Sequence, residues 1–292
     1  MPSNLKLQIV ALFHCVILSS AVHSQQEPAF SMPWKVLSVQ NPSLTATNEN
    51  TVISQTGRIL WPNILDPAYT SVSAFEQKIE KISSAVGLNY TYDQIGSIMR
   101  FHEIRLNYSY ELKFQAHILR FGLAPTFSIK RANFRNAISF TPLDPDLISS
   151  SPIRQPGIDF DLGMSYEFKD LLVGLSSSQV LQTNFDKVLY QNARHLFAFL
   201  QYELELNSNL KFVPRSLYKT DMVSQALDIY ANFETNKGLS LGLGHGFQKN
   251  ISFNLGYRFQ NGFELNYATE YFYSQLNDIA IELNLRYFIK SD

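Results

Sequence analysis

The closest approach to a chemical motif lies at positions 241–246, where Gly242, Gly244 and Gly246 alternate with other residues. This spacing superficially resembles the glycine-rich loop that binds nucleotide phosphates. Such a loop follows a strand and begins a helix, whereas a second strand-like segment follows here. Because alternate residues of a strand share one face, we interpret the three glycines as a thin stripe on a strand. The motif therefore predicts no cofactor.

The histidines outside the first 24 residues also indicate no reaction centre. They are His102, His117, His195 and His245, and no two have the spacing of zinc ligands. A hydrolase would need a serine or aspartate beside one of them on a neighbouring strand, and no local signature supports such a pair. We therefore predict no enzyme, no catalytic residue, no metal and no cofactor, and keep a barrel hydrolase as a third alternative.

Composition excludes several classes of protein. The chain has 292 residues and a formal net charge of −1, and only 17% of its residues are charged, against a usual share of about 25%. Such sparse charge argues against a disordered chain and against a nucleic-acid partner. A mean hydropathy of −0.10 excludes a bundle of membrane helices.

Residues 1–24 have the pattern of a secretory signal peptide. Lys6 precedes a short apolar stretch, and small residues come before an expected cleavage between Ser24 and Gln25. The only cysteine, Cys15, lies within this segment. We expect an exported mature chain that is stabilised without disulfides.

From residue 82 onward the dominant pattern has a period of two. In residues 103–114 apolar side chains alternate with polar ones, so a strand there would have one oily and one wet face. We predict twelve such strands, many of them as long as the roughly 9–11 residues that cross a bilayer. They lie at about 82–93, 102–113, 117–130, 157–168, 171–178, 194–206, 210–219, 226–234, 239–247, 251–259, 263–273 and 279–290.

The chain before residue 82 is less regular. Segments 36–39 and 51–61 are candidates for two more strands, which would bring the total to fourteen. Prolines interrupt anything longer, and this part is also compatible with a place in the periplasm or inside the barrel. The predicted organisation is a signal peptide at 1–24, an irregular segment at 25–81 with up to two strands, and a barrel at 82–292.

Loop lengths favour a transmembrane barrel over a soluble sandwich. Alternate connections are short, whereas the other set includes 131–156 and 179–193. Up-and-down outer-membrane barrels have short periplasmic turns and longer outer loops. We therefore predict an all-β, up-and-down antiparallel transmembrane barrel of about 14 (12–14) strands, with the polar face toward the lumen. Aromatic residues near strand ends fit interfacial girdles: Tyr90, Tyr92, Tyr108, Tyr110, Tyr257, Phe259, Tyr271 and Tyr287.

Several motifs resemble the PorP/SprF membrane proteins of the type IX secretion and gliding machinery of Bacteroidetes. Residues 25–31 resemble the family's opening, and Asp66-Pro67-Ala68-Tyr69 is similar to its Asn-Pro-Ala-Tyr element, with Asp in place of Asn. Arg194-His195, followed by the turn at 209–214, resembles a later strand and turn of the family. The stretch 31–60 is longer than the family's usual link, and the chain does not end on an aromatic residue. Tyr287 and Phe288 are then the expected C-terminal insertion signal.

The resemblance implies a non-enzymatic component of type IX secretion and gliding motility in the bacterial outer membrane. Its implied partners are a secreted, adhesin-type cargo protein, periplasmic or peptidoglycan-associated secretion components, and outer-membrane lipid. The alternative is a passive or substrate-selective pore, since the same barrel with an open lumen would conduct.

Overall fold

The computed structural model describes residues 29–47, 51–64, 66–133, 151–188, 190–247, 249–273 and 278–289. The expected signal peptide and its cleavage site at Ser24 and Gln25 lie outside these residues. Among the described residues, no helix is long and apolar enough to span a membrane.

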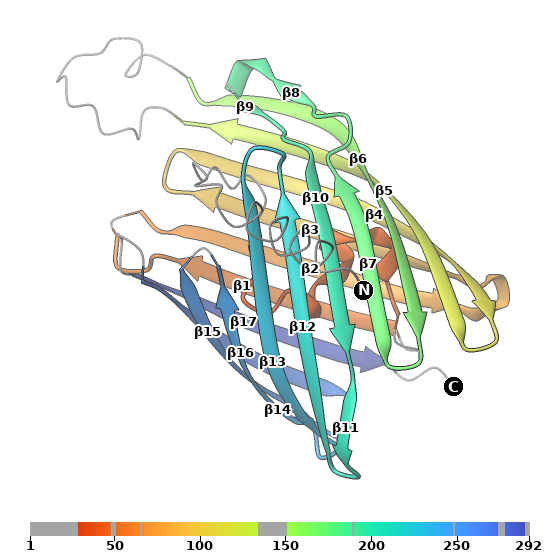
Figure 1. The fold of residues 1–292 in the computed structure, drawn as a ribbon. Helices are drawn as coiled ribbons and strands as arrows, with labels where there is room; N and C mark the ends of the chain where they lie inside the picture. Colours follow the sequence, from red (N-terminus) through yellow and green to blue (C-terminus); the bar gives the residue numbers. More distant parts are fainter. Residues whose placement is uncertain are drawn as a thin grey trace, which may run out of the picture.

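The described chain is dominated by one antiparallel sheet that closes into a 14-stranded barrel (Figure 1). Each strand pairs with its neighbours in sequence, and closure comes from the pairing of the first strand with the last, Thr51 opposite Ile289. The strands are β1 (Thr51–Leu60), β2 (Ala68–Ile79), β3 (Ser84–Ile95), β4 (Met99–Phe114), β5 (His117–Ala132), β6 (Ile153–Phe168), β7 (Leu171–Ser178), β10 (His195–Tyr202), β11 (Leu204–Asn207), β12 (Leu210–Thr220), β13 (Gln225–Thr235), β14 (Leu239–Gly246), β15 (Asn250–Arg258), β16 (Phe263–Phe272) and β17 (Asp278–Ile289).

The twelve segments expected after residue 82 all coincide with barrel strands. The segment expected at 194–206 is divided into β10 and β11. Both pair with β12, one after the other, so together they count as one of the fourteen strands. Period-two patterning therefore located the strands, because a barrel wall between lipid and lumen imposes opposite polarity on successive side chains.

The region before residue 82 differs from the expectation. Segment 51–61 does form a strand, β1, but 36–39 is part of a short helix, and the fourteenth strand is β2. Barrel strands therefore begin at Thr51, earlier than residue 82. The β2 strand escaped prediction because its outward side carries Ser71, Ser73 and Gln77 among the apolar residues, which blurs the alternation.

The alternation of exposure identifies the two faces of the wall. On β4, Ile104, Leu106 and Tyr108 are exposed, whereas the intervening Arg105 and Asn107 are buried. The same inversion, with apolar side chains outside and polar ones inside, runs along the other long strands. The polar face therefore lines the lumen, and most of the expected girdle aromatics face outward.

Two connections that the sequence pattern places at 94–101 and 220–225 are shorter in the structure. Gly96-Ser97-Ile98 suffices between β3 and β4, and 221–224 between β12 and β13, so the contrast in loop length rests mainly on 133–152 and 179–194. The short turns, such as 169–170 and 208–209, share the end where β1 begins and β17 ends. By the rule for outer-membrane barrels this is the periplasmic end.

The outward position of Leu106 yields a test of the membrane-facing surface. Leu106→Arg is expected to lower the free energy of folding into lipid vesicles by about 2–4 kcal/mol, because arginine would be buried in hydrocarbon. The measurement is urea-dependent unfolding in vesicles, with Leu106→Met as the control that retains an apolar side chain. Equal stability of the arginine and methionine variants would show that this face is not lipid-exposed.

Candidate functional site

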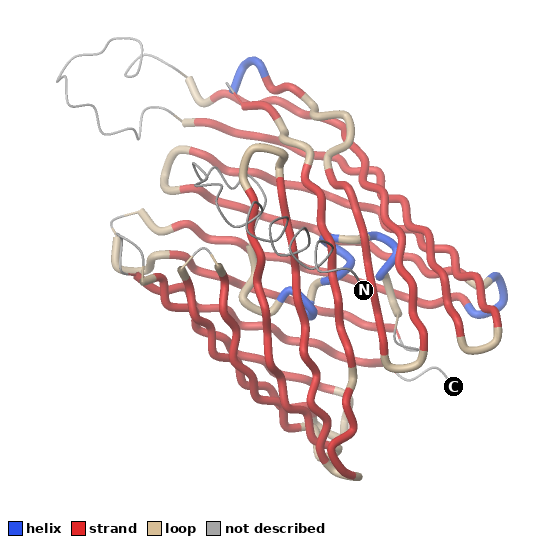
Figure 2. Tube along the Cα trace, viewed as in Figure 1, coloured by secondary structure: helices blue, strands red, loops and turns tan. Residues whose placement is uncertain are grey.

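The lumen contains the N-terminal part of the described chain. Residues 29–47 form three short helical turns, η1 (Pro33–Lys35), α2 (Leu37–Gln40) and η2 (Pro42–Leu44), which lie inside the ring of strands (Figure 2). Almost every side chain in 29–47 is buried. We call this segment the plug.

The plug is helical for local reasons. Pro33 and Pro42 occupy first positions of helical turns, where the missing N–H costs no hydrogen bond. The Asn41 side chain accepts from the backbone N–H of Ser43 at 3.0 Å and so caps η2. A strand would instead need partners for its two edges, which the closed wall does not offer.

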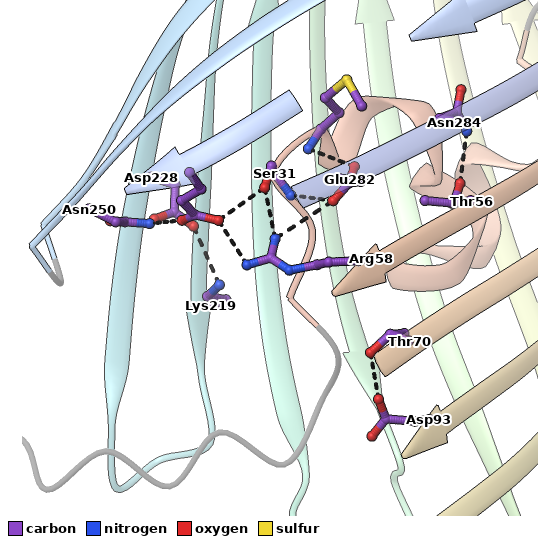
Figure 3. Close-up of polar contacts among 12 residues, drawn as sticks. Ser31, Thr56, Arg58, Thr70, Asp93, Lys219, Asp228, Asn250, Glu282 and Asn284 are labelled. Atoms are coloured by element: carbon purple, nitrogen blue, oxygen red, sulfur yellow. Dashed lines mark hydrogen bonds and ion pairs between the residues drawn. The ribbon is translucent and has the colours of Figure 1, made fainter. Parts of the chain in front are cut away.

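A charged cluster holds the start of the plug (Figure 3). Arg58 on β1 pairs with Glu270 on β16 at 2.8 Å and with Glu282 on β17 at 3.6 Å. The Glu282 carboxylate accepts the backbone N–H groups of Ser31 at 2.7 Å and Met32 at 3.1 Å. Since Arg58, Glu270 and Glu282 are all buried, their charges are compensated by each other, by the plug and by the Asn250 side chain, which donates to Glu270.

Two further carboxylates bind the plug at other points. Glu264 on β16 forms an ion pair with Lys35, and burial lowers the pKa of the Lys35 ammonium while Glu264 opposes that shift. Glu76 on β2 accepts from the Ser38 hydroxyl at 2.5 Å and from the backbone N–H of Ala46 at 2.7 Å. Lumenal acids thus satisfy plug donors along its whole length.

The opposite wall supplies donors to plug carbonyls. Arg105 on β4 donates to the Val39 carbonyl at 2.6 Å and is itself paired with Asp161 on β6, also at 2.6 Å. The Ser176 hydroxyl donates to the Gln40 carbonyl at 2.6 Å. These contacts satisfy carbonyls at the C-terminal end of α2, which have no partner within so short a helix.

Glycines make room for η2 on this wall. A Cβ added at Gly122 on β5 would lie 2.1 Å from the Ser43 nitrogen, and one at Gly163 on β6 would lie 2.0 Å from the Asn41 side-chain oxygen. Gly122 and Gly163 are direct partners across β5 and β6. The plug backbone therefore touches the wall where side chains are missing.

Apolar packing adds to the contacts between the plug and the wall. Met32, Trp34 and Leu44 of the plug form one buried cluster with residues of β10, β12, β13 and β16. The Trp34 ring meets that of Tyr230 edge-on at a centroid distance of 4.8 Å, and the Arg215 guanidinium lies 4.9 Å from the Trp34 ring. Burial of these apolar side chains stabilises the plug inside the barrel relative to a plug exposed to water.

The segment that follows β7 lies at the outer end of the barrel, opposite the periplasmic turns. Its small hairpin, β8 (Asn184–Phe185) and β9 (Tyr190–Gln191), lies beside β6, where β7 has already ended. The Asp159 carboxylate accepts backbone N–H groups of Leu181 at 2.8 Å and Thr183 at 3.1 Å. The ammonium of Lys130 lies 4.3 Å from the ring of Phe101 and 3.9 Å from that of Tyr190.

The motif residues singled out in the sequence lie at two separate places. Asp66 and Pro67 belong to the outer connection before β2, where Asp66 accepts from the Ser97 hydroxyl at 3.0 Å, and Ala68 and Tyr69 begin β2. Arg194 donates to the Val180 carbonyl at 2.7 Å, and His195 is buried at the start of β10. The structure does not bring these motifs together.

The two C-terminal aromatics face opposite sides of the wall. Tyr287 is exposed on the outward face, whereas Phe288 is buried on the lumenal face, where the guanidinium of Arg258 lies 3.8 Å from its ring. Their role as an insertion signal stays a prediction.

The histidines are scattered through the wall. His102 bonds to the Tyr90 hydroxyl at 2.9 Å, and His117 bonds to the Tyr166 hydroxyl at 2.6 Å. His195 and His245 lie on β10 and β14. Within the described ranges no group of acidic, histidine or cysteine side chains could hold a metal ion.

A closed barrel with an apolar exterior and a polar lumen defines an outer-membrane protein. Solved structures support this class. The Ralstonia pickettii toluene transporter TbuX matches with a TM-score of 0.57 at 9% identity, over 86% of this chain and 93% of that chain. The monoaromatic hydrocarbon channel CymD matches with a TM-score of 0.55 at 10% identity, over 90% and 94%. Acinetobacter baumannii Omp33 matches with a TM-score of 0.52 at 9% identity, over 82% and 98%.

Sequence comparison gives the family. The model of the type IX secretion system membrane protein PorP/SprF matches residues 22–287, and the chain belongs to this family. Comparison with curated proteins finds no significant match. The likeness to the solved barrels shows the fold alone, whereas the family makes the chain a secretion-related barrel of the outer membrane.

The plug and its carboxylate partners were not predicted as a site. Alternation placed residues such as Glu264 and Glu282 on the lumenal face, but their plug partners lie more than 200 positions away in sequence. The sequence held one indication of the plug. The proline-interrupted segment before residue 82 was compatible with a place inside the barrel.

The glycine contacts predict how the plug can be dislodged. Gly122→Ala is expected to displace η2, because the new methyl group would overlap the backbone at Ser43. The measurement is maleimide labelling of Ser43→Cys in a Cys15→Ser background, which should be slow in the parent and at least about tenfold faster in the Gly122→Ala variant. Gly57→Ala is the control, since its Cβ would meet only the Tyr69 hydroxyl at 3.6 Å. Equal labelling in all three proteins would refute the tight fit.

The charged cluster predicts a large effect of removing its cation. Arg58→Met leaves Glu270 and Glu282 buried without their cation and is expected to reduce the free energy of unfolding by about 3–5 kcal/mol. The measurement is urea unfolding followed by the fluorescence of Trp34 in a Trp61→Phe background, since the chain has two tryptophans. Adding Glu270→Gln and Glu282→Gln to Arg58→Met should recover a large part of the loss, whereas a loss that persists unchanged would mean that the charges do not depend on one another.

Proposed function

We propose that this barrel is a closed docking component of type IX secretion that anchors a secreted cargo protein, of the adhesin type, at the cell surface. The observation that carries the proposal is the filled lumen. A segment held by buried carboxylates, arginines and a tryptophan cluster leaves the barrel wall and its two rims as the binding surfaces. Family membership supports a role in secretion.

The two rims offer different partners different surfaces. The outer rim carries the hairpin β8–β9 and the connections 61–67 and 221–224, which are accessible to a secreted protein. The periplasmic rim carries short turns, and the edge of β11 extends past the β6–β7 turn, with Leu204 to Asn207 exposed. We infer that cargo contacts the outer rim and that periplasmic or peptidoglycan-associated components contact the inner one. Export would begin with removal of residues 1–24.

A substrate-selective pore is the second candidate. It is favoured by the likeness of the fold to a toluene transporter and a monoaromatic hydrocarbon channel. Because identity to them is only 9–10%, their substrates do not transfer to this chain. Conduction through this barrel would require the plug to move out of the lumen. That movement would expose the buried ion pairs of Arg58 and Arg105 to water.

Surface display tests the docking role. Deletion of the gene is expected to abolish display of one particular cargo, while the other secreted proteins reach the surface normally. The measurement is comparative surface labelling followed by mass spectrometry, with the gene restored as the control. Normal display of every cargo in the deletion strain would refute docking.

Planar bilayers separate docking from conduction. The parent protein is expected to give no discrete currents, because residues 29–47 fill the lumen, whereas the Gly122→Ala variant is expected to open intermittently. Gly57→Ala again serves as the control and should stay silent. Stable channels formed by the parent protein would favour the pore.

A further inference from the structure

The outward face of the barrel is almost free of charge, with one exception. On the barrel strands that the structure describes, the only charged side chains at outward-facing positions are Arg100 on β4, Arg131 on β5 and Arg154 on β6, and all three are exposed. Every other charged residue of these strands has lumenal parity. Arginine on the outward face is strongly disfavoured at the middle of the membrane and tolerated near its surfaces, so the gathering of all three at one place requires an explanation.

The three arginines form one row across three adjacent strands. Arg100 is the direct partner of Arg131, and Arg131 is the direct partner of Arg154. Directly opposed side chains on one face have Cβ atoms about 4.5–5.5 Å apart, and like charges at that distance destabilise a sheet. We call Arg100, Arg131 and Arg154 the arginine row.

The row has no internal counter-charge in the described part of the chain. The ion pairs found there involve carboxylates with lumenal parity, such as Glu111 and Asp161, and none reaches the arginine row. The three positive charges therefore repel one another without compensation from the described residues. An external anion would convert this repulsion into attraction.

The row lies at a defined depth in the wall. Two positions from the row toward the periplasm, the outward-facing residues of the three strands are His102, Ile129 and Pro156. Two positions further in the same direction, they are Ile104, Phe127 and Ile158. The last three are exposed apolar side chains of the lipid-facing band.

Aromatic groups mark the boundary between the apolar band and the row. The His102 ring packs at 5.1 Å from Tyr92 and accepts or donates a hydrogen bond with the Tyr90 hydroxyl. Tyrosines of this kind concentrate at the membrane–water interface. The row is one step beyond them at the outer end, since β4 and β5 run from there to the periplasmic turn at 115–116.

We propose that the arginine row is a binding site for the phosphate groups of an anionic glycolipid in the outer leaflet of the membrane. A planar guanidinium donates two parallel hydrogen bonds to phosphate oxygens, and adjacent guanidiniums can share one phosphate. The apolar side chains Ile104, Phe127 and Ile158 then face the acyl chains of the same lipid. The site is independent of cargo docking and of the plug.

Lipid binding to the purified full-length protein in detergent tests the site. Native mass spectrometry with lipid A that carries phosphate is expected to show adducts of the parent protein. The variant with Arg100→Gln, Arg131→Gln and Arg154→Gln should bind at least about tenfold more weakly, since the charge-assisted hydrogen bonds to the phosphate oxygens are lost. The parent should prefer phosphorylated over dephosphorylated lipid A by a similar factor.

A matched control removes the same charge elsewhere. Lys81, Lys169 and Lys237 are exposed at periplasmic turns, and replacing all three with Gln should leave lipid binding within about a factor of two. Heat-dependent gel mobility verifies that each variant is folded, and the single Arg131→Gln variant replaces the triple one if that barrel does not form. Unchanged binding by a folded arginine variant, or equal affinity for dephosphorylated lipid, would overturn the proposal. Inorganic phosphate that competes at the same concentration as lipid A would show a free-anion site and overturn the lipid assignment.

Discussion

The structure depends on one constraint, that a polar group removed from water must find its partner inside the protein. In hydrocarbon, backbone N–H and C=O groups have no water to bond, so every strand must be hydrogen-bonded to a neighbour on both edges. The pairing of β1 with β17 meets this requirement for the first and last strands. The same requirement applies to side chains of the lumen. Arg58, Glu270, Arg105 and Asp161 are as buried as core residues of a soluble protein, and each has a charged partner.

The plug follows from that requirement and also from the shape of the wall. Its main-chain N–H groups and carbonyls would be unsatisfied inside the barrel if the lumen were apolar. Instead Glu282 accepts two of its N–H groups, while Arg105 and Ser176 donate to its carbonyls. On the side of β5 and β6 the contact is so close that glycine is required, and on the side of β13 it is an aromatic packing. The lumen is thus a core that combines polar and apolar contacts.

The plug inside the barrel and the nearly uncharged outward face distinguish the rims from the lipid-facing wall. Under the proposed docking role, the plug inside the barrel leaves the rims, where the loops and the β11 edge lie, for contact with protein partners. On the described strands, the outward face carries no charge apart from the arginine row, which lies at one depth. The proposed lipid site is therefore separate from the rims.

The sequence by itself determined the fold class and most of the strands, because lipid on one side and polar groups on the other impose alternation on every strand that crosses. It also determined which residues face the lumen, such as Glu264 and Glu282, and the family resemblance that the family model confirms. Only the tertiary structure decided that segment 36–39 is a helix inside the barrel, that β2 is the remaining strand, and that Arg100, Arg131 and Arg154 stand side by side. The physical reason is that alternation is a property of neighbours in sequence, whereas the plug contacts join residues more than 200 positions apart and the arginine row depends on the register between strands.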